Sequence, residues 1–191
     1  KWKYNCYFSK SIWHKGIFIM ATELQFIKSA TCTSATSSLQ VTDCFSAEYD
    51  VYKVILQVDS VTAEAGTNIR LIDSGGVDST ANYDNASLYM KSTTSFSELQ
   101  GTGETSWEYA MYNEGSVGGF FVMYVYNPFD SSSFTFAQSQ LASHYIASST
   151  STLIGRKGIF VHKVAEQITG IEATQSSSRL ENATLVVYGV K

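Results

Sequence analysis

The segment Tyr49-Asp50-Val51-Tyr52-Lys53-Val54-Ile55-Leu56-Gln57-Val58-Asp59 is the strongest strand signal in the sequence. Successive side chains of a strand point to opposite faces. One face of this segment therefore carries four large side chains: Tyr52, Val54, Leu56 and Val58. The other face mixes apolar and polar side chains: Val51, Lys53, Ile55 and Gln57. This alternation predicts a long strand with its apolar face on a core.

Shorter segments of the same kind follow at regular spacing, separated by turn signals such as Ser74-Gly75-Gly76. About ten strands are expected, among them 24–30, 39–41, 49–59, 68–73, 83–91, 94–100, 107–111, 120–126, 159–161 and 183–188. The first two are expected to form a loose hairpin. The almost continuous apolar run at 120–126 is typical of a strand covered on both faces. With at most one short helical turn, at 165–168, this spacing predicts an all-β sandwich or barrel.

Composition supports the same fold class. Hydrophobic residues make up 44% and aromatics 14% of the 191 residues, which argues against disorder. Charged residues make up 16%, against about 25% in an average globular protein. With 27 Ser, 18 Thr and a single Pro, the chain has the residues of strands rather than those of a helical bundle.

The charge is unevenly spread along the chain. Residues 1–19 hold four Lys and no acidic residue, whereas from Met20 onward 9 basic residues face 17 acidic ones. An acidic body disfavours nucleic-acid binding, and no run of 18 apolar residues predicts membrane insertion. Because the sequence style changes at Met20, residues 1–19 are expected to be a non-native leader or a disordered arm before a single domain at 20–191.

The three cysteines are too few for a disulfide scaffold. Cys32 and Cys44 could pair across a hairpin, but two reduced and buried thiols are the favoured interpretation. Without a recognisable signal-peptide core, the chain is expected to be made in a reducing cytoplasm.

No catalytic constellation is predicted. Glu104 and Glu108 flank Trp107, but on one strand the carboxylates would stand ~13 Å apart, beyond the separations used in glycoside hydrolysis. His144 and His162 are isolated from any catalytic motif and are expected to be structural.

No metal and no cofactor are predicted. Four oxygen-bearing residues in a Gly-containing region, Asp73, Asp78, Asp84 and Asn85, could hold Ca²⁺, but their spacing matches no calcium loop. Solvated loop acids are the favoured interpretation. The cysteines lack zinc-site spacing.

Aromatic residues with a polar edge are the best candidates for a binding surface, because they suit sites with one dry and one wet side. The candidates are Tyr83, Tyr89, Tyr109, Tyr112, Tyr124, Tyr126 and Trp107. Of these, Tyr83, Tyr89, Trp107 and Tyr112 are chosen as the expected binding residues. Core packing is the alternative for each, and Tyr124 and Tyr126 are expected to be buried in the sheet or in a subunit contact.

Several motifs together resemble small virion structural proteins and tail-fibre-type domains of tailed bacteriophages, particularly the marine type. They are Tyr49-Asp50-Val51-Tyr52, Asp78-Ser79-Thr80-Ala81-Asn82-Tyr83, Tyr126-Asn127-Pro128-Phe129, Gln167-Ile168-Thr169-Gly170-Ile171 and Val187-Tyr188-Gly189-Val190-Lys191. The resemblance implies an antiparallel β-sandwich with jelly-roll character, located in the virion after synthesis in the host cytoplasm.

The function implied by this resemblance is non-enzymatic: a fibre, appendage or capsid decoration that acts by assembly. Its expected partners are other copies of the chain, in a homo-oligomer such as a trimer, other virion proteins and a host cell-surface polysaccharide. A carbohydrate-binding host-receptor module is the alternative, and a glycan-degrading enzyme is the third reading.

Overall fold

The structure is a computed structural model that describes residues 24–63, 65–93, 96–113, 118–147, 150–175, 177 and 179–191. Within these ranges the chain forms thirteen strands and no helix, and every strand pair is antiparallel. The predicted all-β antiparallel sandwich with jelly-roll character is therefore confirmed. The predicted leader at 1–19 lies outside the described residues.

The larger layer is an eight-stranded sheet in the order β1-β13-β3-β9-β10-β11-β6-β7. Its strands are β1 (Leu24–Cys32), β13 (Leu180–Val190), β3 (Val51–Val61), β9 (Gly119–Tyr126), β10 (Thr135–Ala147), β11 (Thr150–His162), β6 (Tyr83–Lys91) and β7 (Ser97–Glu104).

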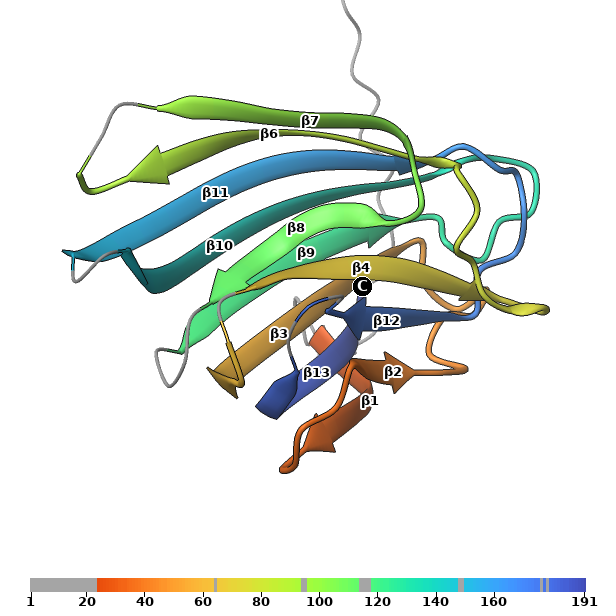
Figure 1. Cartoon of the computed structure of the whole chain (residues 1–191). Helices are drawn as coiled ribbons and strands as arrows, with labels where there is room; N and C mark the ends of the chain where they lie inside the picture. The colour runs from red at the N-terminus through yellow and green to blue at the C-terminus, as the bar shows by residue number, and fades with distance from the viewer. Residues whose placement is uncertain are drawn as a thin grey trace, which may run out of the picture.

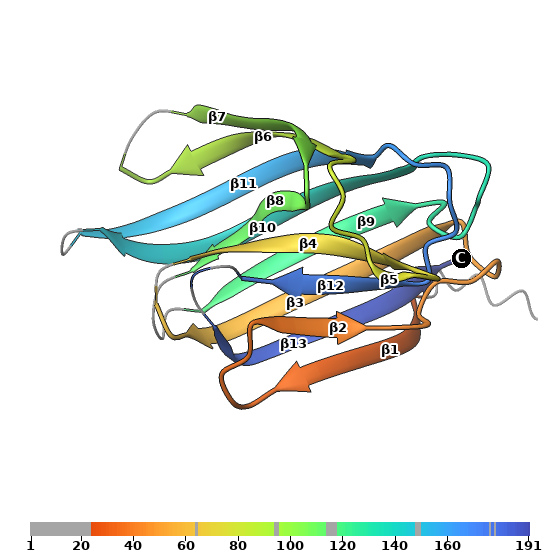
Figure 2. The ribbon, with the colours of Figure 1, turned by 45° about the vertical axis from the view of Figure 1, so that its right-hand side comes forward.

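The smaller layer has the order β2-β12-β4-β5, and β8 also pairs with β4. Its strands are β2 (Ser38–Val41), β12 (Gly170–Thr174), β4 (Ala65–Asp73), β5 (Gly76–Val77) and β8 (Trp107–Asn113). The smaller layer lies over β13, β3 and β9, while the β6–β7 hairpin stands away from β2 and β12 (Figures 1 and 2).

The core lies between the layers, and β3 contributes the face that its alternation predicted. Tyr52, Val54, Leu56 and Val58 are all fully buried. They belong to one hydrophobic cluster that includes Phe121 of β9 and side chains from both sheets. The alternation of apolar residues in β3 therefore predicted correctly which face of the strand is buried.

Two local expectations are wrong. Segments 24–30 and 39–41 form no hairpin, because β1 pairs with β13 and β2 pairs with β12 in the other layer. Residues 165–168 have no helical turn and run as irregular chain between β11 and β12.

The apolar run at 120–126 is covered on one face only, which corrects the expectation of a doubly covered strand. Phe121, Met123 and Val125 are fully buried in the core, whereas Phe120 is 56% exposed on the opposite face. Tyr124 and Tyr126 are half-buried on that outer face rather than buried. No other layer covers this outer face within the described chain.

The two cysteines that the structure describes are not paired with each other. Cys32 and Cys44 are free thiols, and Cys44 is buried with its Sγ 3.3 Å from the carbonyl of Val41. Burial raises the pKa of the Cys44 thiol to about 12, so this thiol is unreactive.

Among the described residues, no helix could cross a membrane.

Candidate functional site

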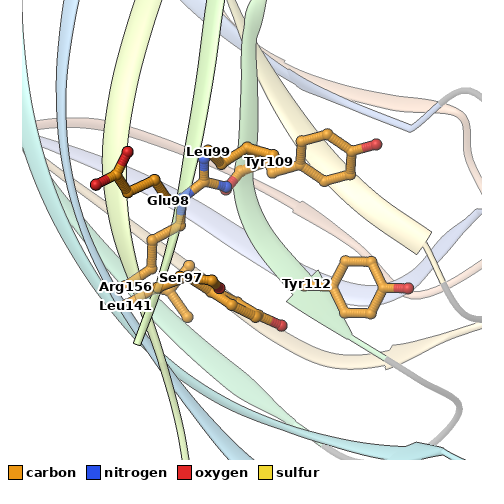
Figure 3. Close-up of a pocket in the computed structure, with 8 residues that line it drawn as sticks. Ser97, Glu98, Leu99, Tyr109, Tyr112, Leu141 and Arg156 are labelled. Atoms are coloured by element: carbon orange, nitrogen blue, oxygen red, sulfur yellow. The ribbon is translucent and has the colours of Figure 1, made fainter. Parts of the chain in front are cut away.

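The candidate site is a cavity of about 310 Å³ between the inner face of the large sheet and β8, a strand of the smaller layer. Strand β8 forms its other wall and contacts β6, β7 and β10. Eight side chains line it (Figure 3): Tyr89, Ser97, Glu98, Leu99, Tyr109, Tyr112, Leu141 and Arg156. Its volume falls at the lower end of the range of small-molecule sites.

Arg156 is the central charge of this cavity. It lies in the middle of β11, opposite Tyr89 of β6 and Leu141 of β10, and is 4% exposed. Both neighbouring strands therefore pair with its backbone, and its side chain projects toward the smaller layer.

The guanidinium is only partly satisfied by the protein. Its Nε donates to Ser87 Oγ at 2.6 Å, and its Nη1 donates to the carbonyl oxygen of Tyr109. Its Nη2 is buried and has no hydrogen-bond partner among the described residues. A buried unpaired donor is costly, and Arg156 also lines the cavity.

The charge of Arg156 persists at neutral pH. Burial lowers the pKa of Arg156 to about 10, and the nearby Tyr89, Glu108 and Tyr109 oppose that fall. The pKa of Glu108 is raised by its own burial and then by the charge of Glu104. The cavity thus holds a permanent, poorly solvated cation.

Tyr109 has an unusual backbone that shapes the cavity. Its φ is 51°, a left-handed conformation that costs a tyrosine of the order of 1 kcal/mol. Its N–H donates to Asn68 Oδ1 at 2.9 Å, and its carbonyl accepts from Arg156. The β4–β8 register shifts between Thr67 and Ile69 at the same place.

This bulge changes which side chains of β8 face the core. Strict alternation would place Trp107, Tyr109 and Met111 on one face, but Tyr109 is 39% exposed and Ala110 is buried. Tyr109 and Tyr112 therefore come to the same cavity, with ring centroids 6.5 Å apart (Figure 3). Sequence reasoning named Tyr109 among the aromatic candidates, but it placed this side chain on one face with Trp107 and Met111 because it assumed an unbroken period of two.

The four aromatic binding candidates divide into two pairs. Tyr89 and Tyr112 line the cavity, so they remain candidates. Tyr83 and Trp107 are fully buried in the core, with their rings 5.8 Å apart, so the prediction that they form a binding surface is wrong. Both of these side chains use their polar edges inside the protein, since Trp107 Nε1 donates to the Val161 carbonyl at 3.0 Å.

The residues weighed as a calcium loop do not gather around one point. Asp84 forms an ion pair with Lys163 at 2.7 Å, and Asp78 instead lies 2.6 Å from His162. The two glutamates weighed for hydrolysis are also placed differently than expected, because Glu104 ends β7 and Glu108 belongs to β8. Their carboxylates interact electrostatically, so the estimate for a single strand does not apply.

Comparison with known proteins finds similarity in structure but not in sequence. No family model matches the sequence, and no curated protein matches it. Among solved structures, the PL-14 alginate lyase from the marine animal Aplysia kurodai aligns with a TM-score of 0.35 and 5% identity, covering 86% of this chain and 97% of that one. The endo-β-1,4-glucuronan lyase from the fungus Trichoderma reesei aligns with a TM-score of 0.26 and 8% identity, covering 85% and 79%.

These two neighbours contradict the functional prediction from the sequence. Both are named as enzymes that cleave polysaccharides, and neither is a virion protein. The non-enzymatic virion component, with its fibre and decoration roles, is therefore corrected, and so is the prediction that the chain is not an enzyme. The homo-oligomer, its other partners and the virion location stay predictions. Because both TM-scores are below 0.5, the function proposed next rests on the cavity itself.

Proposed function

We propose that this chain is an enzyme that cleaves a uronic-acid-containing polysaccharide by β-elimination at the Arg156 cavity. The observation that carries the proposal is the buried guanidinium of Arg156, whose Nη2 has no protein partner within the described chain and whose side chain lines the cavity. A carboxylate is the acceptor that an arginine binds most strongly.

A cation at this position has a specific use in β-elimination. The hydrogen on the carbon next to a sugar carboxylate is hard to remove, because the resulting carbanion adds charge to an already charged group. A guanidinium that neutralises the carboxylate stabilises this developing charge, and a poorly solvated site strengthens the effect. Arg156 would hold the carboxylate through Nη2 while Ser87 and the Tyr109 carbonyl fix the guanidinium plane.

The tyrosines supply the groups for proton transfer. Tyr89 lies beside Arg156 in the β6–β11 register and interacts with its charge, so its phenolate is our candidate for the base that takes the proton from C5 and becomes the neutral phenol. The C4–O4 bond then breaks, a C4=C5 double bond forms, and the leaving oxygen takes a proton. Tyr112, on the facing wall, is the candidate donor.

The lining also argues for elimination over hydrolysis. Glycoside hydrolysis uses two carboxyl groups on either side of the bond. Among the lining residues that the structure describes, Glu98 is the one carboxylate. The cavity is instead rich in tyrosine and holds one arginine.

The test follows the ultraviolet absorbance of the new C4=C5 bond. The full chain is incubated with polyuronates such as alginate, glucuronan and polygalacturonate, and with neutral polysaccharides. We expect absorbance to rise with one of the polyuronates alone, and Arg156→Met to reduce the rate by about 100-fold or more.

Lys157→Met is the matched control, because the neighbouring side chain carries the same charge on the opposite, exposed face. It is expected to retain the rate. If no polyuronate is cleaved, or if the two variants behave alike, the proposal is wrong.

A further inference from the structure

A second cluster of chemically capable side chains lies at the C-terminal end of β11. His162 is the last residue of this strand, Asp78 directly follows β5, and Glu166 lies in the segment between β11 and β12. Residues that are far apart in the sequence thus meet at one end of the sandwich. This cluster, Asp78–His162–Glu166, lines none of the cavities described above.

The three donor atoms converge on a small volume. His162 Nε2 lies 2.6 Å from Asp78 Oδ2 and 3.7 Å from Glu166 Oε1, and all three atoms lie within 4.8 Å of one another. The His162 side chain is fully buried, that of Asp78 is 7% exposed and that of Glu166 is 28% exposed. Glu166 therefore gives the cluster its access to solvent.

The two buried members are held in place by their neighbours. Asp78 Oδ1 accepts two hydrogen bonds from Thr80, at 2.7 Å from its N–H and 2.6 Å from its hydroxyl. This leaves Oδ2 directed at His162. The Tyr83 ring packs on the imidazole with centroids 4.7 Å apart, and its hydroxyl donates to the Asp78 carbonyl at 3.0 Å. Such outer support is typical of metal ligands.

Apart from His162 itself, the cations near the cluster are paired elsewhere. In the described part of the chain, the nearby Lys163 is paired with Asp84 and Arg70 with Glu172. His162 Nε2 carries at most one proton, yet two carboxylates face it. A divalent cation at this point would satisfy both.

We propose that Asp78, His162 and Glu166 form a binding site for a first-row divalent transition metal, for which Zn²⁺ is the probe. One imidazole nitrogen and two carboxylate oxygens suit zinc, whereas Ca²⁺ and Mg²⁺ prefer oxygen ligands alone. The ligand pair at 2.6 Å opens by a few tenths of an ångström on binding, and the imidazole proton moves from Nε2 to Nδ1. His162 Nδ1 has no acceptor among the described residues, so we expect weaker binding than at sites where this nitrogen is bonded.

The test is calorimetric titration of the chelator-treated full chain with ZnCl₂, together with CoCl₂ titration followed by visible absorption. We expect one Zn²⁺ per chain to depend on the cluster, with Glu166→Gln weakening this component by about tenfold or more. Co²⁺ is expected to show the strong visible bands of a low-coordinate site.

Asp84→Asn is the matched control, because it removes one carboxylate nearby that pairs with Lys163 and not with the cluster. It is expected to leave Zn²⁺ binding unchanged. Glu166 is partly exposed, so its variant is expected to fold, which thermal unfolding checks. The proposal is overturned if no Zn²⁺ binds, if Glu166→Gln binds as the wild type does, or if Ca²⁺ and Mg²⁺ bind equally well.

Discussion

The middle and the C-terminal end of β11 place similar groups in opposite surroundings. Arg156 and His162 both lie on the inner face of this strand, and both are at least 96% buried. Arg156 contacts a hydroxyl and a carbonyl and has no salt bridge within the described residues. His162 instead faces two carboxylates, those of Asp78 and Glu166.

The difference comes from the segments that cover each of these two residues. Segments 74–82 and 163–169 bring carboxylates over His162, whereas Arg156 lies against β8 and lines a cavity. Glu98 lines the cavity of Arg156 and Glu108 acts on its charge, but neither forms a salt bridge with it in the part of the chain that the structure describes. His162, by contrast, lies 2.6 Å and 3.7 Å from the oxygens of two carboxylates. The same strand thus presents sites of opposite preference, which is why we assign a carboxylate ligand to one and a metal ion to the other.

The comparison predicts its largest stability effect at the histidine end. His162→Leu removes the partner of a buried carboxylate and should lower the free energy of unfolding by about 3 kcal/mol, because an unpaired buried charge is costly. Chemical denaturation at neutral pH measures this loss.

A double variant separates lost packing from the unpaired charge. Asp78→Asn in the His162→Leu background replaces the carboxylate with a neutral amide and should recover part of the stability. A double variant that is as unstable as the single one would show that the charge is not the cause.

The next largest effect is expected at the β4–β8 contact that shapes the cavity around Arg156. A Cβ added to Gly66 would lie 2.5 Å from Tyr109 Cδ1, so Gly66→Ala must displace the ring. We expect a loss of about 1–2 kcal/mol in unfolding free energy and a weaker polyuronate cleavage rate. Gly75→Ala is the control, because its nearest new neighbour is the Asp73 carboxylate at 3.1 Å, a side chain that can move. Equal effects of the two substitutions would contradict the contact.

The sequence predicts single strands well and their surroundings poorly. The alternation of β3 identified its core face because one strand determines its own side-chain period. It could not identify partners, since the pairing of β1 with β13 and of β2 with β12 joins distant segments. The expected hairpin failed for this reason.

The binding residues show the same limit. Tyr83 and Tyr89 stand on the same face of β6, yet the first is in the core and the second lines the cavity. Only the position at which the smaller sheet ends distinguishes them, and no local pattern encodes it. Tyr109 was a candidate by residue type alone, and the bulge that interrupts the period of β8 and brings it to the cavity could not be predicted. The Asp78–His162–Glu166 cluster required two loops to be placed in space.

A smaller effect with a defined pH dependence is expected from Thr80→Val. Burial raises the pKa of Asp78, but hydrogen bonds from Thr80 and His162 outweigh this and hold it below its ordinary value. A depressed carboxyl pKa contributes stability above the unfolded pKa of about 3.9, and this is lost as the pH falls through the folded value.

Removing the Thr80 hydroxyl brings the folded pKa of Asp78 closer to the unfolded value. We expect a loss of about 1 kcal/mol near neutral pH that shrinks below about pH 4. Denaturation of both proteins across this pH range measures it. A difference that is constant with pH would indicate lost packing instead.

The smallest effect on stability is expected in the middle of β11, from Arg156→Met. Methionine removes a buried cation together with its desolvation cost, and it leaves one carbonyl, that of Tyr109, without a donor, because Ser87 Oγ can still donate to Leu99. These terms oppose each other, so the unfolding free energy should change by less than about 1 kcal/mol. His162→Leu removes a partner and leaves the charge, whereas Arg156→Met removes the charge itself. A destabilisation by Arg156→Met as large as that by His162→Leu would mean that Arg156 is a structural cation whose partners already satisfy it, and a carboxylate ligand would then not be needed to explain its position.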